Sequence, residues 1–252
     1  SIRRQRQMCI RDRYYIKVKK LSLIIPCYNE SKNLPTLLGK CNELFKLEKD
    51  IEIILVDNGS TDETSKVLDD ITTDMSFITR VKVDLNQGYG HGILAGLSIA
   101  KGEIIGWTHA DMQTDPSDVL KGYDFFQKSA TPEFLFVKGN RHNRPIFDTI
   151  FTIGMAIFET ILLRRVMWDI NAQPTLFHRS FFLNWSSPPK DFSLDLYAYY
   201  VAIKTGLKIK RFPVKFSKRL YGMSNWNFSF SSKYRFIKRT LFYSFNLRRK
   251  MN

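Results

Sequence analysis

The chain has 252 residues, of which 44% are hydrophobic and 14% aromatic, and this composition excludes a disordered or fibrous protein. Its three cysteines, Cys9, Cys27 and Cys41, exclude a disulfide-rich scaffold and form no C-x-x-C pair of the kind that binds zinc. No apolar run reaches the roughly 18 to 20 residues of a membrane-spanning helix and no signal peptide is visible, so we expect a non-integral protein in a reducing compartment.

The net charge of +15 is distributed unevenly along the chain. Residues 1–20 carry a net charge of +7, residues 21–130 carry −7 and residues 131–252 carry +15. The positive second half indicates an anionic partner, which is a phosphate ligand, an anionic membrane or a nucleic acid. Residues 1–13 show no apolar periodicity, and we interpret residues 1–20 as a non-native or disordered extension that is left out of the fold.

From residue 21 onward, short apolar runs alternate with amphipathic stretches, which predicts alternating strands and helices. Strands are predicted at residues 21–28, 51–58, 77–85, 103–110 and 134–140. Helices are predicted at residues 31–48, from Thr61, at 88–100 and at 116–128. This alternation predicts an α/β domain over residues 21–230, with a mostly parallel sheet flanked by helices.

The second half of the chain is less regular. Its pattern predicts a strand at residues 175–178, a helix at about 192–205 and a strand at 207–216. An apolar helix is predicted at 146–163, and residues 231–252 predict a basic amphipathic helix. These last two helices are typical of segments that lie on an anionic membrane, where each basic group adds about 1 kcal/mol of attraction. The alternative is that 146–163 packs on the sheet and the C-terminal helix is a solubilising face.

Polar side chains follow three of the predicted strands, at the point where each strand ends. They are found in the segments YNE (28–30), DNGS (57–60) and HADMQ (109–113). Since ligands of parallel sheets bind at the carboxyl ends of the strands, we expect these side chains to line a site. Asp111 and Gln113 provide a carboxylate and an amide oxygen two residues apart, and such hard ligands suit Mg²⁺ or Mn²⁺ bridged to a diphosphate.

Four motifs occur in the order and spacing of glycosyltransferase family 2, namely PCYNE (26–30), VDNGSTD (56–62), NQGYG (86–90) and ADMQ (110–113). The chain most resembles the polyprenyl-phosphate branch of that family, to which dolichol-phosphate mannosyltransferase belongs. The resemblance extends over residues 21–224. It implies a Rossmann-like GT-A fold, a nucleotide-diphospho-sugar donor of the UDP or GDP type, and an inverting transfer.

The same resemblance implies roles for individual residues. The positions that match the nucleotide-sugar site are Pro26, Tyr28, Glu30, Asp57, Gly88 and Asp111. The positions that match the metal site are Asp111 and Gln113, with His109 in a place where the family usually has aspartate. A histidine leaves fewer hard oxygen ligands there, so a softer ion or weaker metal binding is expected; the alternative is that His109 caps a strand end.

Three arginines resemble phosphate-binding residues of the polyprenyl-phosphate branch. Arg141 and Arg144 follow the fifth predicted strand, and Arg219 begins an Arg-x-x-Gly-x-Ser motif that ends at Ser224. Guanidinium groups suit this role because their fork binds phosphate in two places at once. Asp195 matches an acidic position on a helix that faces the site, either as a general base or as a positioning group. Asp111, Asp195, Arg141 and Arg219 are therefore the candidate catalytic residues.

The favoured hypothesis is a metal-dependent transferase that moves a sugar to a polyprenyl phosphate, peripheral on the cytoplasmic face of a membrane. A second hypothesis within the same family is transfer to a sugar acceptor in a surface glycan. A third, from another class, is a basic nucleic-acid-binding protein. We expect no nucleic-acid partner, because the acidic half bears the ligand-like strand ends and the positive charge matches no nucleic-acid-binding motif.

Overall fold

The computed structural model describes residues 20–72, 75–221 and 230–251. Seven strands form one sheet in the order β3-β2-β1-β4-β6-β5-β7. The strands are β1 (Leu21–Cys27), β2 (Ile51–Asn58), β3 (Ile78–Val83), β4 (Ile104–Trp107), β5 (Leu135–His142), β6 (Thr175–His178) and β7 (Lys208–Lys215). The α-helices are α2 (Leu34–Leu47), α3 (Thr64–Thr72), α4 (Tyr89–Ile99), α5 (Asp118–Gln127), α6 (Ile146–Leu163), α7 (Arg179–Leu183), α8 (Leu194–Lys204) and α9 (Phe230–Met251), and a 3₁₀ turn, η1, spans Pro132–Phe134.

The sheet is mostly parallel, which confirms the α/β class predicted from the alternation of strands and helices. Strand β1 pairs in parallel with β2 and β4, β2 with β3, and β5 with β7. The exception is β6, which runs antiparallel to both of its neighbours, β4 and β5. The sequence predicted this strand but not its direction, because a run of four residues carries no signal of orientation. Helix α7, which follows β6 directly, was not predicted.

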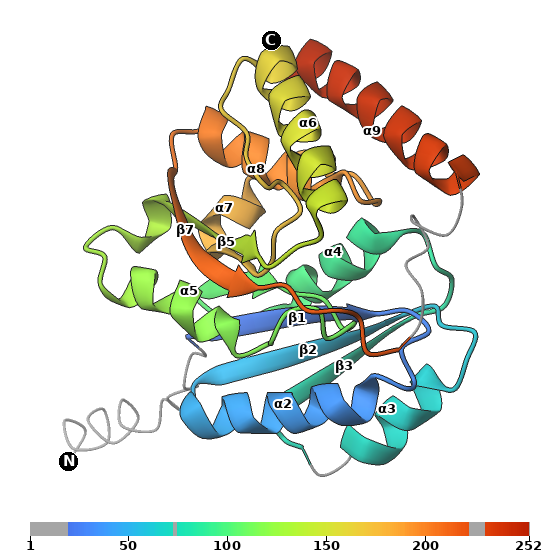
Figure 1. The fold of residues 1–252 in the computed structure, drawn as a ribbon. Coiled ribbons are helices and arrows are strands. Elements are labelled where there is room, and N and C mark those ends of the chain that lie inside the picture. Colours follow the sequence, from blue (N-terminus) through green and yellow to red (C-terminus); the bar gives the residue numbers. More distant parts are fainter. Residues whose placement is uncertain (1–19, 73–74, 222–229, 252) are drawn as a thin grey trace, which may run out of the picture.

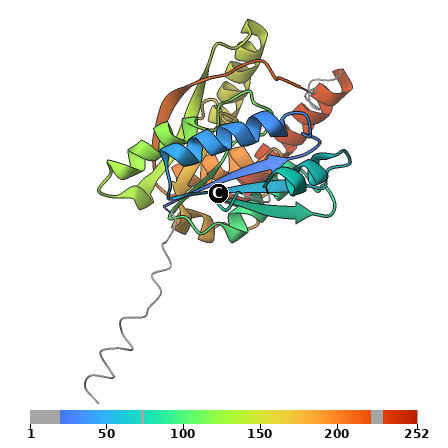
Figure 2. The ribbon, with the colours of Figure 1, turned by 90° about the horizontal axis from the view of Figure 1, so that it is seen from below.

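The side chains of the central strands alternate between two cores, one on each face of the sheet. On β1, Leu23 and Ile25 belong to a core with α2, α3 and α5, whereas Ile24 belongs to a second core with α4 and α8. This division follows from the two-residue period of a strand. Strands β1 and β2 are buried on both faces, as expected for parallel strands covered by helices. Figures 1 and 2 show α2 lying along one of these faces.

Helices α6 and α9 form a pair away from the sheet, side by side in Figure 1. The rings of Phe158 and Phe245 meet edge to face with centroids 6.2 Å apart, and Ser244 contacts Glu159. One stripe of α6 is exposed and consists of Ile146, Ile150, Ile153, Ile157 and Ile161. The main neighbour of α6 is thus another helix, α9, while Leu163 at the end of α6 joins the core on one face of the sheet. Within the described ranges, none of the helices is both long enough and apolar enough to cross a membrane.

A buried carboxyl group joins these two helices. The Ser244 hydroxyl lies 2.5 Å from Glu159 Oε1 and 2.8 Å from the Thr240 carbonyl oxygen. One hydroxyl carries a single proton. The Ser244 hydroxyl therefore shares its one proton between two acceptors, Glu159 Oε1 and the Thr240 carbonyl oxygen. Burial raises the pKa of Glu159 from 4.5 to about 7, against the opposing effect of the Ser244 hydrogen bond.

The close contact of β4 with β6 predicts one stability effect. A Cβ atom on Gly106 would overlap the Thr175 carbonyl oxygen and the Leu176 side chain, whereas a Cβ atom on Gly154 of α6 would meet nothing within 4 Å. We expect Gly106→Ala to lower the free energy of unfolding by about 1–3 kcal/mol, because the backbone of β6 must shift. Gly154→Ala is the control and should raise stability by about 0.5–1 kcal/mol. Urea denaturation of both variants measures this, and equal midpoints would contradict the packing.

The Glu159 carboxyl predicts a dependence of stability on pH. Its pKa is higher in the folded than in the unfolded chain, so folding takes up a proton and the stabilisation is complete below about pH 4.5. The free energy of unfolding should then fall, by about 3 kcal/mol at most, as the pH rises through about 7. Glu159→Gln, which stays neutral, should remove this decline in urea denaturation curves measured near both ends of that range. An unchanged slope in the variant would show that Glu159 is not the group responsible.

Candidate active site

A cavity of about 1000 Å³ opens where strands β1, β2 and β4 end and extends beneath α6, α8 and α9. The sequence-predicted residues that line it are Pro26, Tyr28, Glu30, Gly88, His109, Asp111, Gln113, Arg141, Arg144, Asp195 and Arg219. These residues come from both halves of the chain. Parallel pairing explains why the residues from the first half lie together, because the carboxyl ends of parallel strands meet at the same edge of the sheet.

Asp57 is placed differently from the other candidates. It is buried, and its Oδ1 atom accepts a hydrogen bond from the Ser60 backbone nitrogen at 3.0 Å. Asp57 is not one of the described residues that line the cavity, whereas the next residue, Asn58, is one of them. Its carboxylate therefore shapes the turn that follows β2, and its expected contact with the nucleotide stays a prediction.

Asp111 and Arg219 form an ion pair on the cavity wall. Arg219 Nη2 donates to Asp111 Oδ2 at 2.7 Å, and Arg219 Nη1 lies 3.9 Å from Glu30 Oε1. The other Asp111 oxygen accepts a hydrogen bond from the Gln113 backbone nitrogen at 3.1 Å. Burial raises the pKa of Glu30, while Asn33 and Arg219 act in the opposite direction. The guanidinium thus balances two carboxylates that come from different strand ends.

The oxygen atoms near Asp111 determine whether a divalent metal ion fits in this part of the cavity. Asp111 supplies a carboxylate, and Gln113 supplies an amide oxygen while its Nε2 donates to the Ser217 carbonyl at 3.3 Å. Across the parts of the chain that the structure describes, no three His, Cys, Asp or Glu side chains are grouped closely enough to hold a metal by themselves. This donor set fits a cation such as Mg²⁺ that takes most of its ligands from phosphate oxygens and water. Arg219 competes with such a cation for the same Asp111 oxygen.

His109 also lines the cavity and packs against the ring of Tyr89. The two ring centroids are 5.4 Å apart, and Tyr89 stacks on Phe192 with centroids 4.8 Å apart. Burial lowers the pKa of His109, and the charges of Asp111 and Asp195 partly oppose this effect. The imidazole is therefore neutral at pH 7 and has a free lone pair, as a metal ligand requires. Asp111 and Asp195 line the same cavity as His109.

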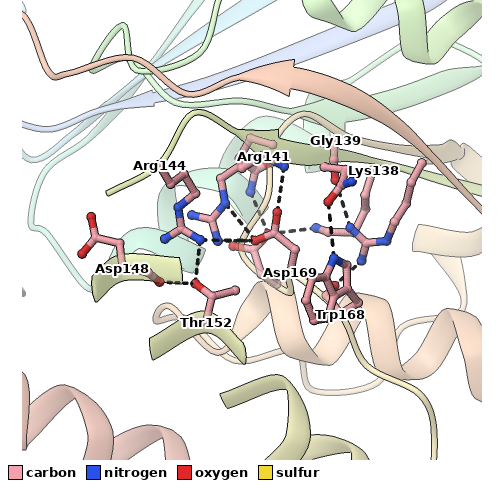
Figure 3. A network of polar contacts seen from close by, with 12 residues as sticks. Lys138, Gly139, Arg141, Arg144, Asp148, Thr152, Trp168 and Asp169 are labelled. Carbon is pink, nitrogen blue, oxygen red and sulfur yellow. Dashed lines mark hydrogen bonds and ion pairs between the residues drawn. The ribbon is translucent and has the colours of Figure 1, made fainter. Parts of the chain in front are cut away.

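Arg141 and Arg144 are held by one acidic residue, Asp169 (Figure 3). The Arg141 backbone nitrogen donates to Asp169 Oδ2 at 2.9 Å, and Arg141 Nε and Nη2 donate to Oδ1. Arg144 Nη1 lies 4.0 Å from the same Oδ1 and donates to Thr152 Oγ1 at 2.6 Å. Burial acts to raise the pKa of Asp169, but Arg141 and Arg144 together keep it below its usual value.

Phe216 completes the support of the two arginines. The guanidinium carbons of Arg141 and Arg144 lie 5.3 and 5.6 Å from the centroid of its ring. This is within the range of a cation–π contact. Two positive charges are thereby held side by side on the cavity wall, an arrangement that suits a phosphate group.

The two residues that contact the Asp195 carboxylate were not among the site residues predicted from the sequence. Lys138, from β5, and Gln173, from the loop before β6, both contact Asp195 and are fully or almost fully buried. The sequence did contain a signal for Lys138, since it is a lone charge directly after the apolar run FLFV (134–137). Of the Arg219–Ser224 motif, Gly222 and Ser224 lie outside the described residues.

The family described as Glycosyl transferase family 2 matches residues 22–181, which is more than half of the chain. The chain belongs to this family. The matched residues, 22–181, contain strands β1 to β6 and all four motifs on which the resemblance in the sequence was based. The family and the GT-A type of fold predicted from those motifs are therefore confirmed.

Two relatives carry the description undecaprenyl-phosphate 4-deoxy-4-formamido-L-arabinose transferase. The protein from Enterobacter sp. (strain 638) is 38% identical over 116 residues, and that from Proteus mirabilis (strain HI4320) is 34% identical over 117 residues. The matched segments cover 42% and 43% of this chain and 36% of each relative. The chain thus spans about a third of the length of the curated relatives that it matches.

Solved structures show the same fold at low sequence identity. Glucosyl-3-phosphoglycerate synthase from Mycobacterium tuberculosis, in complex with Mn²⁺, UDP and glucosyl-3-phosphoglycerate, has a TM-score of 0.70 and 15% identity, covering 91% of this chain and 80% of that one. A mannosyltransferase from Pyrobaculum calidifontis, in complex with GDP-Man and Mn²⁺, has a TM-score of 0.61 and 18% identity, covering 81% and 58%. At these identities the likeness establishes the fold.

The contacts of Asp169 predict that it stabilises the fold as well as the site. The side chains of Arg141 and Asp169 are 11% and 4% exposed, so Asp169→Asn leaves a guanidinium with little compensation in a buried place. We expect a loss of about 3 kcal/mol in the free energy of unfolding. The control is Asp124→Asn, which removes the exposed pair with Lys128 on α5 and should cost about 0.5 kcal/mol or less. Similar losses in the two variants, measured by urea denaturation, would contradict the role of Asp169.

Proposed function

We propose that this chain is an inverting, metal-dependent glycosyltransferase that moves a sugar from a nucleotide-diphospho-sugar to a polyprenyl phosphate at a membrane surface. The observation that carries the proposal is the gathering of Asp111, Arg141, Arg144 and Arg219 around one cavity at the carboxyl ends of the strands. Membership of glycosyl transferase family 2 supports the reaction class. The names of the undecaprenyl-phosphate transferases that it resembles support the acceptor class.

The donor binds at the strand ends in this proposal. Pro26, Tyr28, Glu30 and Gly88 line that part of the cavity and form the base and ribose site, with Asp57 shaping the adjacent turn. The diphosphate lies toward Asp111 and Arg219. Both UDP and GDP sugars remain candidates, as the printed ligands of the two structural neighbours include one of each type.

Asp111, Gln113 and His109 would hold a Mg²⁺ or Mn²⁺ ion together with the diphosphate. When bound, the cation neutralises negative charge that develops on the leaving nucleoside diphosphate. Arg219 acts on the same charge, since its guanidinium lies 2.7 Å from Asp111 and can turn to a phosphate oxygen. Removal of one such electrostatic donor typically costs about 2.7–4 kcal/mol of transition-state stabilisation.

The acceptor phosphate is placed at Arg141 and Arg144. Asp169 and Phe216 hold both guanidinium groups, so little side-chain freedom is lost when the phosphate binds. A phosphate is already ionised near neutral pH and needs no base to deprotonate it. Asp195 therefore orients a substrate in this proposal.

The helix pair α6 and α9 supplies the contact with the membrane. The isoleucine stripe of α6 is exposed, and so are Tyr234, Phe242 and Phe245 of α9. The last turn of α9 carries Arg248, Arg249 and Lys250. Apolar side chains flanked by basic ones favour a peripheral position on an anionic leaflet, which we place on the cytoplasmic side.

The proposal is tested by transfer into lipid. The protein is screened by thermal shift against UDP-glucose, UDP-N-acetylglucosamine and GDP-mannose with Mn²⁺, because a ligand of the folded state raises its stability. The selected donor, radiolabelled, is then incubated with undecaprenyl phosphate in detergent micelles and extracted into organic solvent. We expect label in the organic phase with the wild type. With Asp111→Asn we expect at least about a 100-fold loss, because the metal and Arg219 both lose their carboxylate.

The matched control is Lys208→Met, which changes an exposed residue of β7 that does not line the cavity and should transfer normally. Full activity of Asp111→Asn would remove the metal-site assignment. Label that stays in the aqueous phase on a sugar acceptor would show that the acceptor is a glycan and not a polyprenyl phosphate. No thermal shift with any nucleotide sugar would contradict the proposed reaction class.

A further inference from the structure

A lysine lies in the interior of the molecule, next to the cavity. Lys138 of β5 is 0% exposed. The aromatic residues Phe136 of β5 and Phe177 of the paired strand β6 are neighbours in the same two strands. Lys138 Nζ donates to Thr175 Oγ1 at 2.6 Å, from the residue paired with it on β6. Burying an ammonium group is unfavourable unless it is paired and hydrogen-bonded, so its partners must compensate for lost water.

The charged partner of Lys138 is Asp195, in the first turn of α8. Lys138 Nζ lies 3.6 Å from Asp195 Oδ1, and Gln173 Nε2 donates to the same Oδ1 at 2.7 Å. One ion pair and one hydrogen bond, from two different segments, thus hold one oxygen of the carboxylate. Asp195 Oδ2 accepts no hydrogen bond from the residues that the structure describes, although Asp195 lines the cavity. One end of the carboxylate is fixed and the other is available to a ligand.

The position of Asp195 relative to Asp111 indicates which ligand group it meets. Both carboxylates line the same cavity as His109 and Tyr89, and their charges act on both of these side chains. The proposed diphosphate site is at Asp111 and Arg219. A sugar attached to that diphosphate extends away from Asp111, and its hydroxyl groups are the hydrogen-bond donors that a carboxylate oxygen accepts from.

We propose that Lys138 is a positioning residue for Asp195: it fixes one carboxylate oxygen so that the other accepts a hydrogen bond from a hydroxyl group of the transferred sugar. This inference rests on the proposed function, and it assigns to Asp195 a task that needs its charge. Lys138 itself does not touch the substrate. It acts through Asp195, and it acts only while it carries its proton.

The charges around Lys138 make its protonation sensitive to pH. Burial lowers the pKa of Lys138 to about 8, with Asp195 and Asp169 acting to raise it and Arg211 and Arg141 acting to lower it. These groups come from α8, from the loop before β6, from β7 and from β5 itself. Since a lysine is charged below its pKa, Asp195 keeps its counter-ion at pH 7 and loses it as the pH rises through about 8. The rate of sugar transfer should fall over the same range.

A double-mutant cycle in the 252-residue chain tests this inference. The variants are Lys138→Met, which keeps the length of the side chain, Asp195→Asn and the two combined, with Lys208→Met as the control for loss of an exposed lysine from the neighbouring strand. Turnover is measured with the donor selected by thermal shift and undecaprenyl phosphate. We expect Lys138→Met to lower kcat by about 10- to 100-fold, as is typical when the support of a functional side chain is lost. The combined variant should be no slower than Asp195→Asn, because Lys138 then has nothing left to position.

Two readouts separate positioning from a general structural role. Binding of the matching nucleoside diphosphate, which lacks the sugar, should be unchanged in Lys138→Met, whereas binding of the whole nucleotide sugar should weaken. The fall of kcat above about pH 8 should disappear in Asp195→Asn, which retains Lys138 and the fold. Lys138→Arg should keep the rate at alkaline pH, since a guanidinium stays charged.

The inference is overturned if the losses of the two single variants multiply in the combined variant, or if Asp195→Asn keeps the alkaline fall of kcat. Should Lys138→Met fail to fold, the pH profile of Asp195→Asn alone decides. Transfer by the wild type is measured first, so failure of the proposed function is recognised separately, by absence of labelled lipid in every reaction. Equal weakening of nucleoside diphosphate and nucleotide sugar would make Lys138 a structural residue only.

Discussion

The parallel pairing of β1 with both β2 and β4 is the constraint on which the site depends. It brings three strand ends to one edge of the sheet, so that Glu30, Asn58 and Asp111 border the same cavity although they are far apart in the sequence. Acidic groups gathered in this way repel one another unless cations lie between them. Arg219 fulfils that need in the structure, which connects the second half of the chain to the first through charge.

The two halves contribute differently to the chemistry. The first half supplies carboxylate and amide oxygens, and the second supplies the guanidinium groups of Arg141, Arg144 and Arg219. The uneven distribution of charge along the sequence thus reflects a division of tasks within one cavity. The basic half also contributes carboxylates to the cavity lining, from Asp148, Glu159 and Asp195. Asp195 and Asp169 are each paired with a cation. The positive groups are therefore held in defined positions, as recognition of a small anion requires.

The strands and most helices were predictable from the sequence, because their apolar runs have the period of the element and end at turn residues. The gathering of Tyr28, Asp111 and Gln113 was predictable as well, since it follows from parallel pairing alone. The direction of β6 was not predictable, as it depends on which edges of β4 and β5 are free. Nor was the Lys138–Asp195 pair, because it joins β5 to α8 through tertiary packing. The hydrogen bond by which Asp57 holds the turn after β2 was not predictable either, since the motif indicates only its match to the nucleotide-sugar site.

The antiparallel β6 has a consequence for how the chain is made. During synthesis, β4 is complete at residue 107, yet its outer edge is covered only when residues 175–178 have left the ribosome. Strand β5 must likewise wait for β6 and β7. Contacts between such distant segments slow folding, and an open edge invites pairing with other nascent chains. Expression at low temperature or with a chaperone is therefore expected to raise the yield of native protein.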